Sequence, residues 1–234
     1  MLLHYIMRIT ALLYTFLTPV LLFSSPNNLF KMRNMIQSGI LSSLAIPKSS
    51  KSDDTNVNEM YAPPLTLYFY GSVSEDTCFQ LTRALGDLDV QAKKQKVLNP
   101  ELKPHISLHL QSGGGSLMPA FYVCDYIKTL DTPVHTYVDG YVASAASLIS
   151  VSGDKRFMTA HSSILIHQLT GATSGKFNEL KDEMSNLNYF MNKVRQIYLS
   201  STRLDENTLD DLLCSDIWLN ASTCINYGIV DKVI

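Results

Sequence analysis

Three residues of this 234-residue chain carry the side chains that serine-based acyl transfer requires: Ser144, His167 and Asp216. A serine hydroxyl is a weak nucleophile until a neighbouring imidazole accepts its proton, and a carboxylate can fix the tautomer of that imidazole and stabilise its cation. Ser144 lies in GYVASAAS, where small neighbours let a substrate approach the backbone closely. These residue types predict a nucleophile, a general base and an orienting acid.

Each of these residues also fits an ordinary structural role. A serine in an alanine-rich and serine-rich run commonly packs against a neighbouring element, and a histidine at the end of an apolar strand can be hydrogen-bonded within the fold. An aspartate between Ser215 and Ile217 can cap the helix that follows it. The segment GYVASAAS also lacks the GxSxG spacing of α/β-hydrolases. On residue types alone, a catalytic set and three unrelated structural residues are both open alternatives.

The segment SGGGS at 112–116 follows an apolar stretch and precedes a helical pattern. Its glycines allow backbone N–H groups to face outward at a helix N-terminus, which suits an anion. That anion is either a phosphate or the oxyanion of a tetrahedral intermediate, and a plain tight turn is the third alternative. The segment lacks the Lys-Ser/Thr continuation of a P-loop and the glycine spacing of a dinucleotide fingerprint, which disfavours a phosphate.

Strand-like and helix-like patterns alternate around these segments. Strands are expected for LTLYFY at 65–70, ISLHL at 106–110, VHTYV, and SILIH ending at His167. Helices are expected for EDTCFQLTRALGDLD, for the stretch that carries FYVCDYIKTL, and for the small residues from about Val142. The polar, proline-containing stretch at 91–105 is expected to be a surface loop. The alternation predicts the α/β fold class.

Apolar residues at steps of four and three predict a long helix near the C-terminal third of the chain. These residues are Leu180, Met184, Leu187, Met191, Val194 and Tyr198. Such a stripe either packs on the helix's own domain or protrudes and interlocks with a neighbouring subunit.

The first 52 residues differ in composition from the rest. Residues 9–23 form an apolar run of signal-peptide length, and the Ser-rich, acid-free stretch behind it is typical of an organellar transit peptide. We therefore expect a targeting region at 1–52, a linker at 53–64 and one folded domain at 65–234. Two-step import into a plastid is favoured, and a mitochondrion, the secretory path and a membrane anchor are the alternatives.

The overall charge and the cysteines exclude other classes of function. A net charge of −2 provides no basic field of the kind that holds a phosphate backbone, so we expect no nucleic-acid partner. The four cysteines lie far apart, without a CxxC pair or a histidine at metal-ligand spacing. We interpret them as ordinary thiols rather than as a disulfide or a zinc site.

The region from about Leu67 to Ile234 resembles the ClpP family, the proteolytic subunits of the Clp protease. SGGGS stands where the family has a Ser-Pro-Gly-Gly loop, and GYVAS ends where the family nucleophile lies, at Ser144. SILIHQ matches the segment with the family histidine, and CSDIWLNASTCINYGIVDKVI matches the C-terminal stretch with the family aspartate. The resemblance therefore implies a serine endopeptidase with His167 and Asp216 as the other catalytic residues.

The resemblance also implies a fold and an oxyanion hole. The fold is a crotonase-like spiral of βαβ units, with the helix at 176–202 as a protruding handle. The backbone N–H groups of Gly114 and Ala145 would form the oxyanion hole. No metal and no bound cofactor are expected for this chain.

Partners are implied by the same resemblance. Seven-membered rings, made of this chain or of mixed ClpP-type subunits, would stack face to face and enclose the active sites. An AAA+ Clp unfoldase would deliver unfolded proteins, which are cleaved to short peptides in protein quality control. ATP would be consumed by that partner, since this chain has no nucleotide motif.

Several features depart from the family pattern. The linker passes quickly into MYAPPLTLYFY, where family members have an axial loop and a first helix. Ser107 and His109 replace two tyrosines near the docking pocket, Ser215 replaces an arginine, and Gly113 replaces the loop proline. These departures favour a mixed ring and leave a catalytically weak structural subunit as the main alternative, against which the complete triad argues. A crotonase-type acyl-CoA enzyme is the third alternative.

Overall fold

The computed structural model describes residues 64–234. The targeting region predicted at 1–52, and all of the predicted linker except Pro64, lie outside the described residues. The strands and helices, in chain order, are β1 (Thr66–Tyr70), α3 (Glu75–Leu98), β2 (Ile106–Ser112), α4 (Leu117–Thr129), β3 (Val134–Ala143), α5 (Ala145–Val151), β4 (Lys155–Met158), β5 (Ser163–Leu165), α6 (Phe177–Ser201), α7 (Glu206–Leu213), β6 (Trp218–Leu219), α8 (Ala221–Asn226) and β7 (Lys232–Val233).

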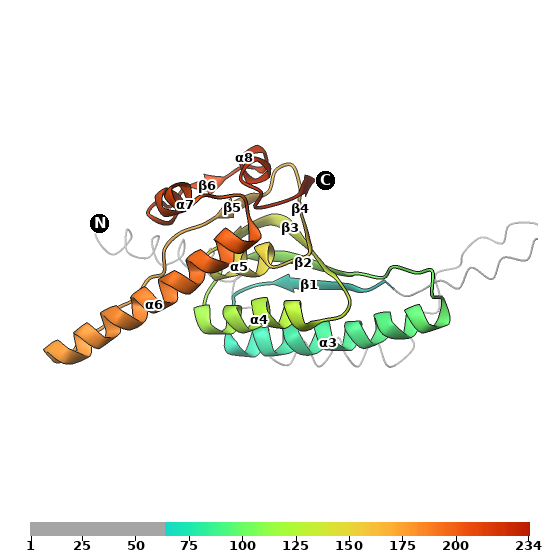
Figure 1. Cartoon of the computed structure of the whole chain (residues 1–234), viewed down its shortest axis with the longest axis horizontal. Helices are drawn as coiled ribbons and strands as arrows, with labels where there is room; N and C mark the ends of the chain where they lie inside the picture. The colour runs from blue at the N-terminus through green and yellow to red at the C-terminus, as the bar shows by residue number, and fades with distance from the viewer. Residues whose placement is uncertain (1–63) are drawn as a thin grey trace, which may run out of the picture. The chain divides into compact units, whose positions relative to one another are not determined.

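Parallel strands form the centre of the fold. The main path of the sheet is β1-β2-β3-β4-β7, and every neighbouring pair on it is parallel. The first half of β3 pairs with β4 and its second half with β5, which in turn pairs antiparallel with β6. Helices α3, α4 and α5 connect successive parallel strands and so make three βαβ units (Figure 1). The predicted α/β fold class is confirmed.

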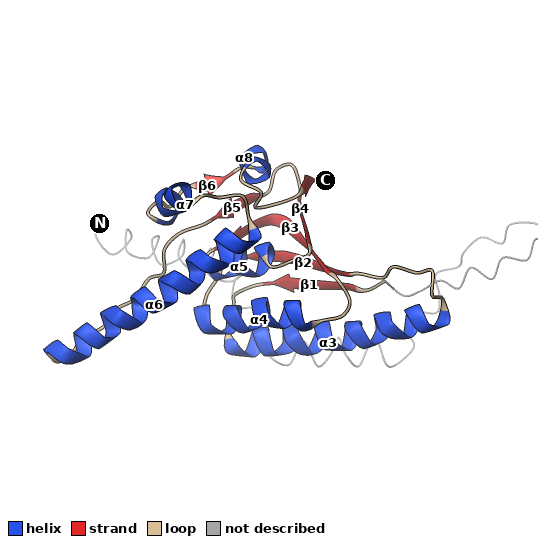
Figure 2. Ribbon diagram, in the orientation of Figure 1, coloured by secondary structure: helices blue, strands red, loops and turns tan. Residues whose placement is uncertain are grey.

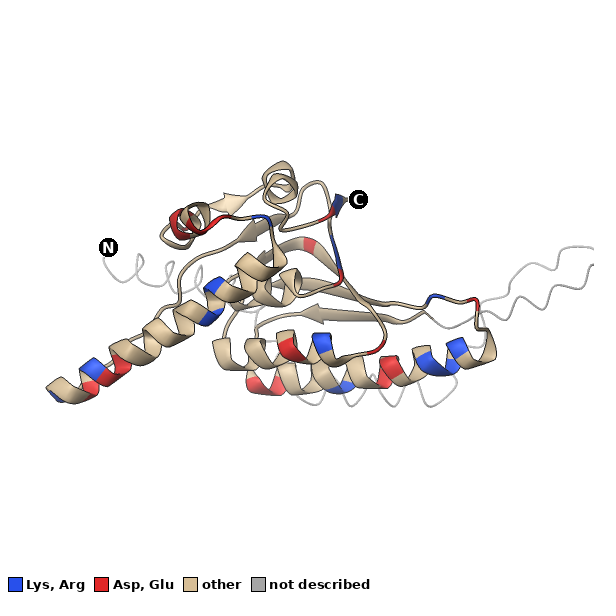
Figure 3. Ribbon diagram, viewed as in Figure 1, with Lys and Arg blue, Asp and Glu red and all other residues tan. Residues whose placement is uncertain are grey.

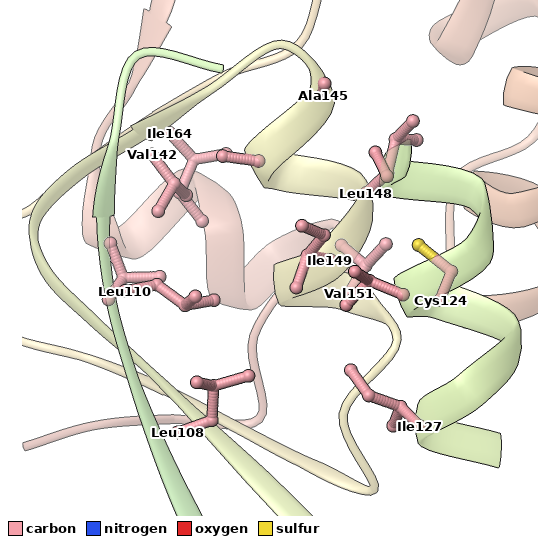
Figure 4. Close-up of a cluster of buried hydrophobic side chains, with 14 of the residues drawn as sticks. Leu108, Leu110, Cys124, Ile127, Val142, Ala145, Leu148, Ile149, Val151 and Ile164 are labelled. Atoms are coloured by element: carbon pink, nitrogen blue, oxygen red, sulfur yellow. The ribbon is translucent and has the colours of Figure 1, made fainter. Parts of the chain in front are cut away.

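The helices cover one face of the sheet because side chains alternate along its strands. In β2, the side chains of Ile106, Leu108 and Leu110 are fully buried, while Ser107 and His109 between them are partly buried. Leucines of β2 meet side chains of α4, α5 and β5 in the cluster of Figure 4. Figure 2 shows α3 and α4 side by side along this face. Burying each such side chain contributes roughly 1.5–3 kcal/mol.

The other face of the sheet carries a row of stacked rings. The strand registers place Tyr68, His109, Tyr137 and Phe157 next to one another on β1 to β4. Successive ring centroids are 4.9, 4.7 and 4.8 Å apart. His109 Nδ1 also lies 2.8 Å from Asp139 Oδ2. Because the side chain of Tyr68 is 61% exposed, the row is open to solvent at its β1 end within the described chain.

Helix α3 is longer than the sequence indicated. It begins after Ser74, whose hydroxyl accepts a hydrogen bond from Thr77 N–H, and it continues to Leu98. The surface loop predicted for 91–105 is therefore wrong for 91–98, which are helical. The prediction gave too much weight to polarity, because Gln, Ala and Lys are good helix formers and the first proline, Pro100, comes only after the helix has ended.

Helix α6 extends away from the sheet as the handle that the resemblance implied (Figure 1). Val194 and Tyr198 near its C-terminal end are buried, whereas Phe177 and Met184 near its N-terminal end are exposed. Acidic and basic residues are interspersed along its N-terminal half (Figure 3). The apolar stripe therefore packs on its own domain at one end of the helix, whereas the other end has no such packing within residues 64–234. Interlocking with a neighbouring subunit stays a prediction. Neither α6 nor any other described helix is both long and apolar enough to cross a membrane.

Candidate active site

Ser144 lies at the turn between β3 and α5 in a backbone conformation that L-amino acids rarely adopt. Its φ is 56° and its ψ is −131°, and it is the one non-glycine residue with a positive φ among residues 64–234. Such a conformation costs of the order of 1–3 kcal/mol and persists where the surroundings hold it. Here Ser144 N–H donates to Leu165 O at 3.0 Å, and Ser147 N–H donates to Ser144 O at 2.9 Å.

The parallel pairing of β3 with β5 brings His167 to the edge of the sheet where Ser144 lies. The register continues to the carboxyl ends of both strands, so Ser144 directly follows one strand and His167 closely follows the other. The predicted strand ending at His167 is too long, because pairing stops at Leu165. Beyond that point the backbone bonds elsewhere, with Gln168 N–H donating to Leu213 O at 2.8 Å.

His167 and Asp216 are in contact, with Nδ1 of the imidazole 3.1 Å from Oδ1 of the carboxylate. An ionised carboxylate only accepts hydrogen bonds, so Nδ1 carries the proton and Nε2 of the neutral ring is the accepting nitrogen. This tautomer is the one that a general base needs. The side chain of His167 is 24% exposed and that of Asp216 is 82% exposed, so water screens their electrostatic attraction.

The contact between the predicted nucleophile and the predicted base is less complete. Among the described residues, no hydrogen bond joins Ser144 Oγ to the imidazole of His167. The structure thus joins His167 to Asp216 and places Ser144 at the same sheet edge, without the bond that would transfer the proton. Catalytic hydrogen bonds are often long without substrate and tighten when substrate binds.

Gly114 lies directly against the turn at Ser144, which we call the nucleophile turn after the role predicted for Ser144. Its φ is +91°, and a Cβ at this position would come within 2.6 Å of both Ala143 O and Ser144 Cβ, and 3.1 Å from Ala145 N. Ala145 begins α5, so its N–H has no partner within that helix. Gly114 N–H donates to Ser112 Oγ at 3.1 Å. The two predicted donors are therefore neighbours, one of them engaged within its own loop, and their role as an oxyanion hole stays a prediction.

The glycine loop is fixed from the side by Val73, which follows β1. Val73 N–H donates to Gly114 O at 2.9 Å, and Ser116 N–H donates to Val73 O at 2.8 Å. A Cβ at Gly115 would lie 2.1 Å from Val73 O, so only glycine fits there. No local sequence pattern indicates this support, because it depends on the pairing of β1 with β2.

A cleft of about 420 Å³ lies beside Ser144 and Ala145. Apolar side chains from α4, α6 and the segment after His167 line much of it: Leu117, Met118, Pro119, Leu169, Leu187 and Phe190. Such walls suit an apolar substrate side chain. A larger cavity of about 590 Å³ at the C-terminal end of α3 includes no predicted site residue, and its Lys93 is paired with Asp89 and Asp131. We therefore place the site in the smaller cleft.

A buried pair of hydroxyl groups lies behind the nucleophile turn. Ser147 Oγ donates to Ser144 O at 2.6 Å, and Tyr198 OH lies 2.7 Å from Ser147 Oγ. Burial raises the pKa of the Tyr198 phenol well above its ordinary value, although the hydrogen bond with Ser147 partly offsets this, so the phenol stays protonated. Sequence reasoning missed the pair because its members are 51 positions apart.

Among the described residues, no three or more His, Cys, Asp or Glu side chains form a group that could hold a metal ion. The cysteines are free thiols, of which Cys78, Cys124 and Cys224 are buried and Cys214 is exposed.

Comparisons with known proteins cover most of the described chain. The family model described as Clp protease matches residues 69–234, which include the glycine loop and all three predicted catalytic residues. The chain is 33% identical to ATP-dependent Clp protease proteolytic subunit 1 of Protochlamydia amoebophila over 129 residues, which are 53% of this chain and 63% of that relative. It is 26% identical to proteolytic subunit 2 of Treponema denticola, over 80% of this chain and 90% of the relative. It is also 24% identical to proteolytic subunit 1 of Chlamydia muridarum, over 72% and 85% of the two chains. Because the family model covers well over half of the sequence, from β1 to β7, this chain belongs to the Clp protease family.

Proposed function

We propose that this chain is a serine-type proteolytic subunit of a Clp protease, with Ser144 as the nucleophile, His167 as the general base and Asp216 as the orienting acid. The observation that carries the proposal is the meeting of a strained serine and a hydrogen-bonded His167–Asp216 pair at one edge of the sheet. Membership of the Clp protease family supplies peptide bonds as the substrate class.

In the proposed reaction, His167 Nε2 accepts the proton of Ser144 Oγ while Oγ attacks the peptide carbonyl carbon. The N–H groups of Ala145 and Gly114 stabilise the resulting oxyanion, which requires Gly114 N–H to exchange Ser112 Oγ for the substrate oxygen. The imidazolium then gives its proton to the leaving nitrogen, and the C–N bond breaks. Water, deprotonated by the same imidazole, attacks the acyl carbon, and the imidazolium gives its proton to Ser144 Oγ as the bond between Oγ and the acyl carbon breaks.

We further propose that this subunit cleaves unfolded proteins to short peptides inside stacked rings of seven, and that an AAA+ Clp unfoldase supplies them. The relatives are described as subunits of ATP-dependent proteases, which supports a partner that uses ATP. The N-terminal half of α6 exposes Phe177 and Met184, which supports contact with a neighbouring subunit. The replacements at Ser107, His109 and Ser215 favour a ring mixed with other ClpP-type chains.

A plastid is the location that we propose, with the mitochondrial matrix as the alternative. The proposal is supported by the composition of residues 1–52, which combine a signal-like apolar run with a transit-like basic stretch.

A second candidate function is a structural ring subunit with weak catalysis of its own. Within the described residues Ser144 and His167 share no hydrogen bond, Asp216 is 82% exposed, and Gly114 N–H is engaged by Ser112. Each of these observations favours a site that is incomplete in the isolated chain. The crotonase-type alternative has no comparable support, since the matching family model is that of Clp protease.

Hydrolysis of a short fluorogenic peptide by the assembled full chain tests the proposal, with wild type compared with Ser144→Ala. The matched control is Ser152→Ala, which removes a buried hydroxyl at the far end of α5 that donates to Leu148 O and contacts the Cys124 thiol. We expect hydrolysis to vanish in Ser144→Ala and to persist in the control. A serine-reactive fluorophosphonate should label wild type and Ser152→Ala, but not Ser144→Ala.

Three outcomes would be decisive against parts of the proposal. Hydrolysis that survives Ser144→Ala would remove Ser144 as the nucleophile. Labelling at a different serine would do the same. An assembled wild type that neither hydrolyses peptide nor reacts with the fluorophosphonate, even when mixed with catalytic sister subunits, would establish the structural-subunit alternative.

A further inference from the structure

We infer that Tyr198 and Ser147 are positioning residues, which orient the peptide group between Ser144 and Ala145 and connect it to helix α6. The inference rests on the proposed function, because this peptide group matters for catalysis only if Ser144 is the nucleophile. Neither residue touches the reacting atoms.

The direction of the two hydrogen bonds follows from the groups involved. Ser144 O can only accept, so Ser147 O–H donates to it across 2.6 Å. A serine hydroxyl has one proton, and that of Ser147 is used in this bond, so Tyr198 O–H must donate to Ser147 Oγ across 2.7 Å. The result is a chain of donors that runs from Tyr198 through Ser147 to the carbonyl of Ser144. In a buried site each bond of such a chain polarises and strengthens the next.

This chain holds the carbonyl at the strained position of the backbone. Ser144 O accepts from both the N–H group and the hydroxyl of Ser147, at 2.9 and 2.6 Å. A peptide group is planar, so the Ser144 carbonyl and the Ala145 N–H point in opposite directions and move together. Fixing the carbonyl from behind therefore fixes the direction of the Ala145 N–H, the proposed oxyanion donor. An oxyanion donor is effective only when it is already aimed at the position where the charge develops.

Helix α6 joins this support to the substrate cleft. Tyr198 lies in its buried C-terminal part, while Leu187, about three turns earlier, lines the cleft beside Ser144. Arg195 of the same helix forms an ion pair with Asp210 of α7, the helix that precedes Asp216. The C-terminal part of α6 thus contacts both Ser147, which lies behind the nucleophile turn, and the helix that precedes Asp216.

A purely structural explanation is the natural rival, because buried hydroxyl groups are usually hydrogen-bonded wherever they occur. Under that explanation, removing the hydroxyls lowers stability and leaves the chemical step alone. Under ours, it lowers kcat and leaves KM unchanged, because an oxyanion donor acts in the transition state and not in substrate binding. The two explanations therefore differ in a kinetic measurement.

The experiment uses the assembled full chain with Tyr198→Phe, Ser147→Ala, the double variant, and Ser152→Ala as the matched control. Tyr198→Phe keeps the ring and removes only the donor at the start of the chain. Rates of peptide hydrolysis are divided by the number of sites titrated with fluorophosphonate, so that unfolded protein is not counted. We expect each single variant to lower kcat about tenfold, the effect of losing one hydrogen bond from the transition state, with KM and the control unchanged.

The double variant tests whether the two residues act in series. Ser147→Ala already disconnects Tyr198 from Ser144, so adding Tyr198→Phe should lower kcat no further. The inference is overturned if Tyr198→Phe has the same kcat per site as Ser152→Ala, or if the two single effects multiply in the double variant. Should Ser147→Ala fail to fold, Tyr198→Phe alone decides. If the wild type neither hydrolyses peptide nor reacts with the fluorophosphonate, the proposed function is refuted, and this inference is refuted with it.

Discussion

Gly113 and Gly114 are neighbours in one loop, yet a methyl group should have opposite consequences at the two positions. At Gly114 the added Cβ would lie 2.6 Å from Ala143 O and from Ser144 Cβ, whereas carbon contacts normally settle at about 3.5–4.0 Å. The loop or the nucleophile turn would therefore have to move by about 1 Å. At Gly113 nothing lies within 4 Å of the added Cβ, and its φ is not positive.

Two contributions set the size of the effect at Gly114. The positive φ of +91° costs an alanine about 1–2 kcal/mol, which destabilises the loop. The forced displacement separates the Gly114 N–H from the oxyanion position, and loss of one such donor lowers kcat by about 10²–10³-fold. We therefore expect Gly114→Ala to lower kcat by about 10²–10³-fold with little change in KM, and Gly113→Ala to stay within about threefold of wild type.

The assay is steady-state hydrolysis of a fluorogenic peptide by the assembled full chain, normalised to sites titrated with a fluorophosphonate. Thermal unfolding of both variants separates a loss of chemistry from a loss of fold. Equal kcat values for Gly114→Ala and Gly113→Ala would refute the reasoning, because the clash and the oxyanion role would then have no consequence. A higher KM with kcat unchanged would place Gly114 in substrate binding instead.

Two further predictions concern carboxylates. Asp216→Asn keeps the size of the side chain that contacts His167 but removes the carboxylate that fixes the tautomer of the imidazole. We therefore expect kcat near neutral pH to fall by about 10²-fold or more. An unchanged kcat would remove Asp216 from the site. Burial raises the pKa of Asp231, but hydrogen bonds and the charge of Arg156 outweigh it and hold that pKa below its usual value. The stability from this pair is therefore present above the ordinary aspartate pKa of about 3.9 and lost as pH falls through the lower folded value. In chemical denaturation, Asp231→Asn should lower the free energy of unfolding by about 1 kcal/mol near neutral pH and by progressively less in acid. The value at neutral pH is kept small because the carboxylate is partly exposed to water. A difference that does not depend on pH would contradict the assignment.

Strands β1, β2, β3 and β5 and the first crossing helices could be predicted because short apolar runs alternate with amphipathic ones, whereas the short strands β4, β6 and β7 were not expected. Predictions failed where the local pattern was ambiguous. The polar stretch after Val90 is helical although it looks like a loop, since nothing before Pro100 breaks the helix. His167 lies past its strand although Ile166 before it is buried, because pairing with β3 ends at Leu165. The helix expected from about Val142 is also wrong at its start, because β3 continues to Ala143 and α5 begins at Ala145. These errors concern element boundaries, which depend on which backbone groups find partners.

The residues of the site could be predicted from the sequence, but the contacts that hold them could not. Ser144, His167 and Asp216 could be named in advance only through the family resemblance, because residue types alone left structural roles open. The positive φ of Ser144, the bond between Gly114 and Ser112, and the donor chain from Tyr198 depend on contacts between distant segments. No local pattern in the sequence records such contacts.

The parallel register of the sheet also determines when the active site can appear as the chain folds. Thr66 pairs with Ser107 across the whole of α3, and the later parallel pairings likewise span complete crossovers. Such non-local pairings form slowly, because the entropy of closing each loop is lost before the contacts are gained. The turn at Ser144 needs Leu165 from β5 and the support of Tyr198 from α6, so it can take shape only after these segments have met. During refolding, reactivity towards a fluorophosphonate should therefore return later than the helical circular dichroism signal. The reactivity of Ser144 then reports when the last step of folding is complete.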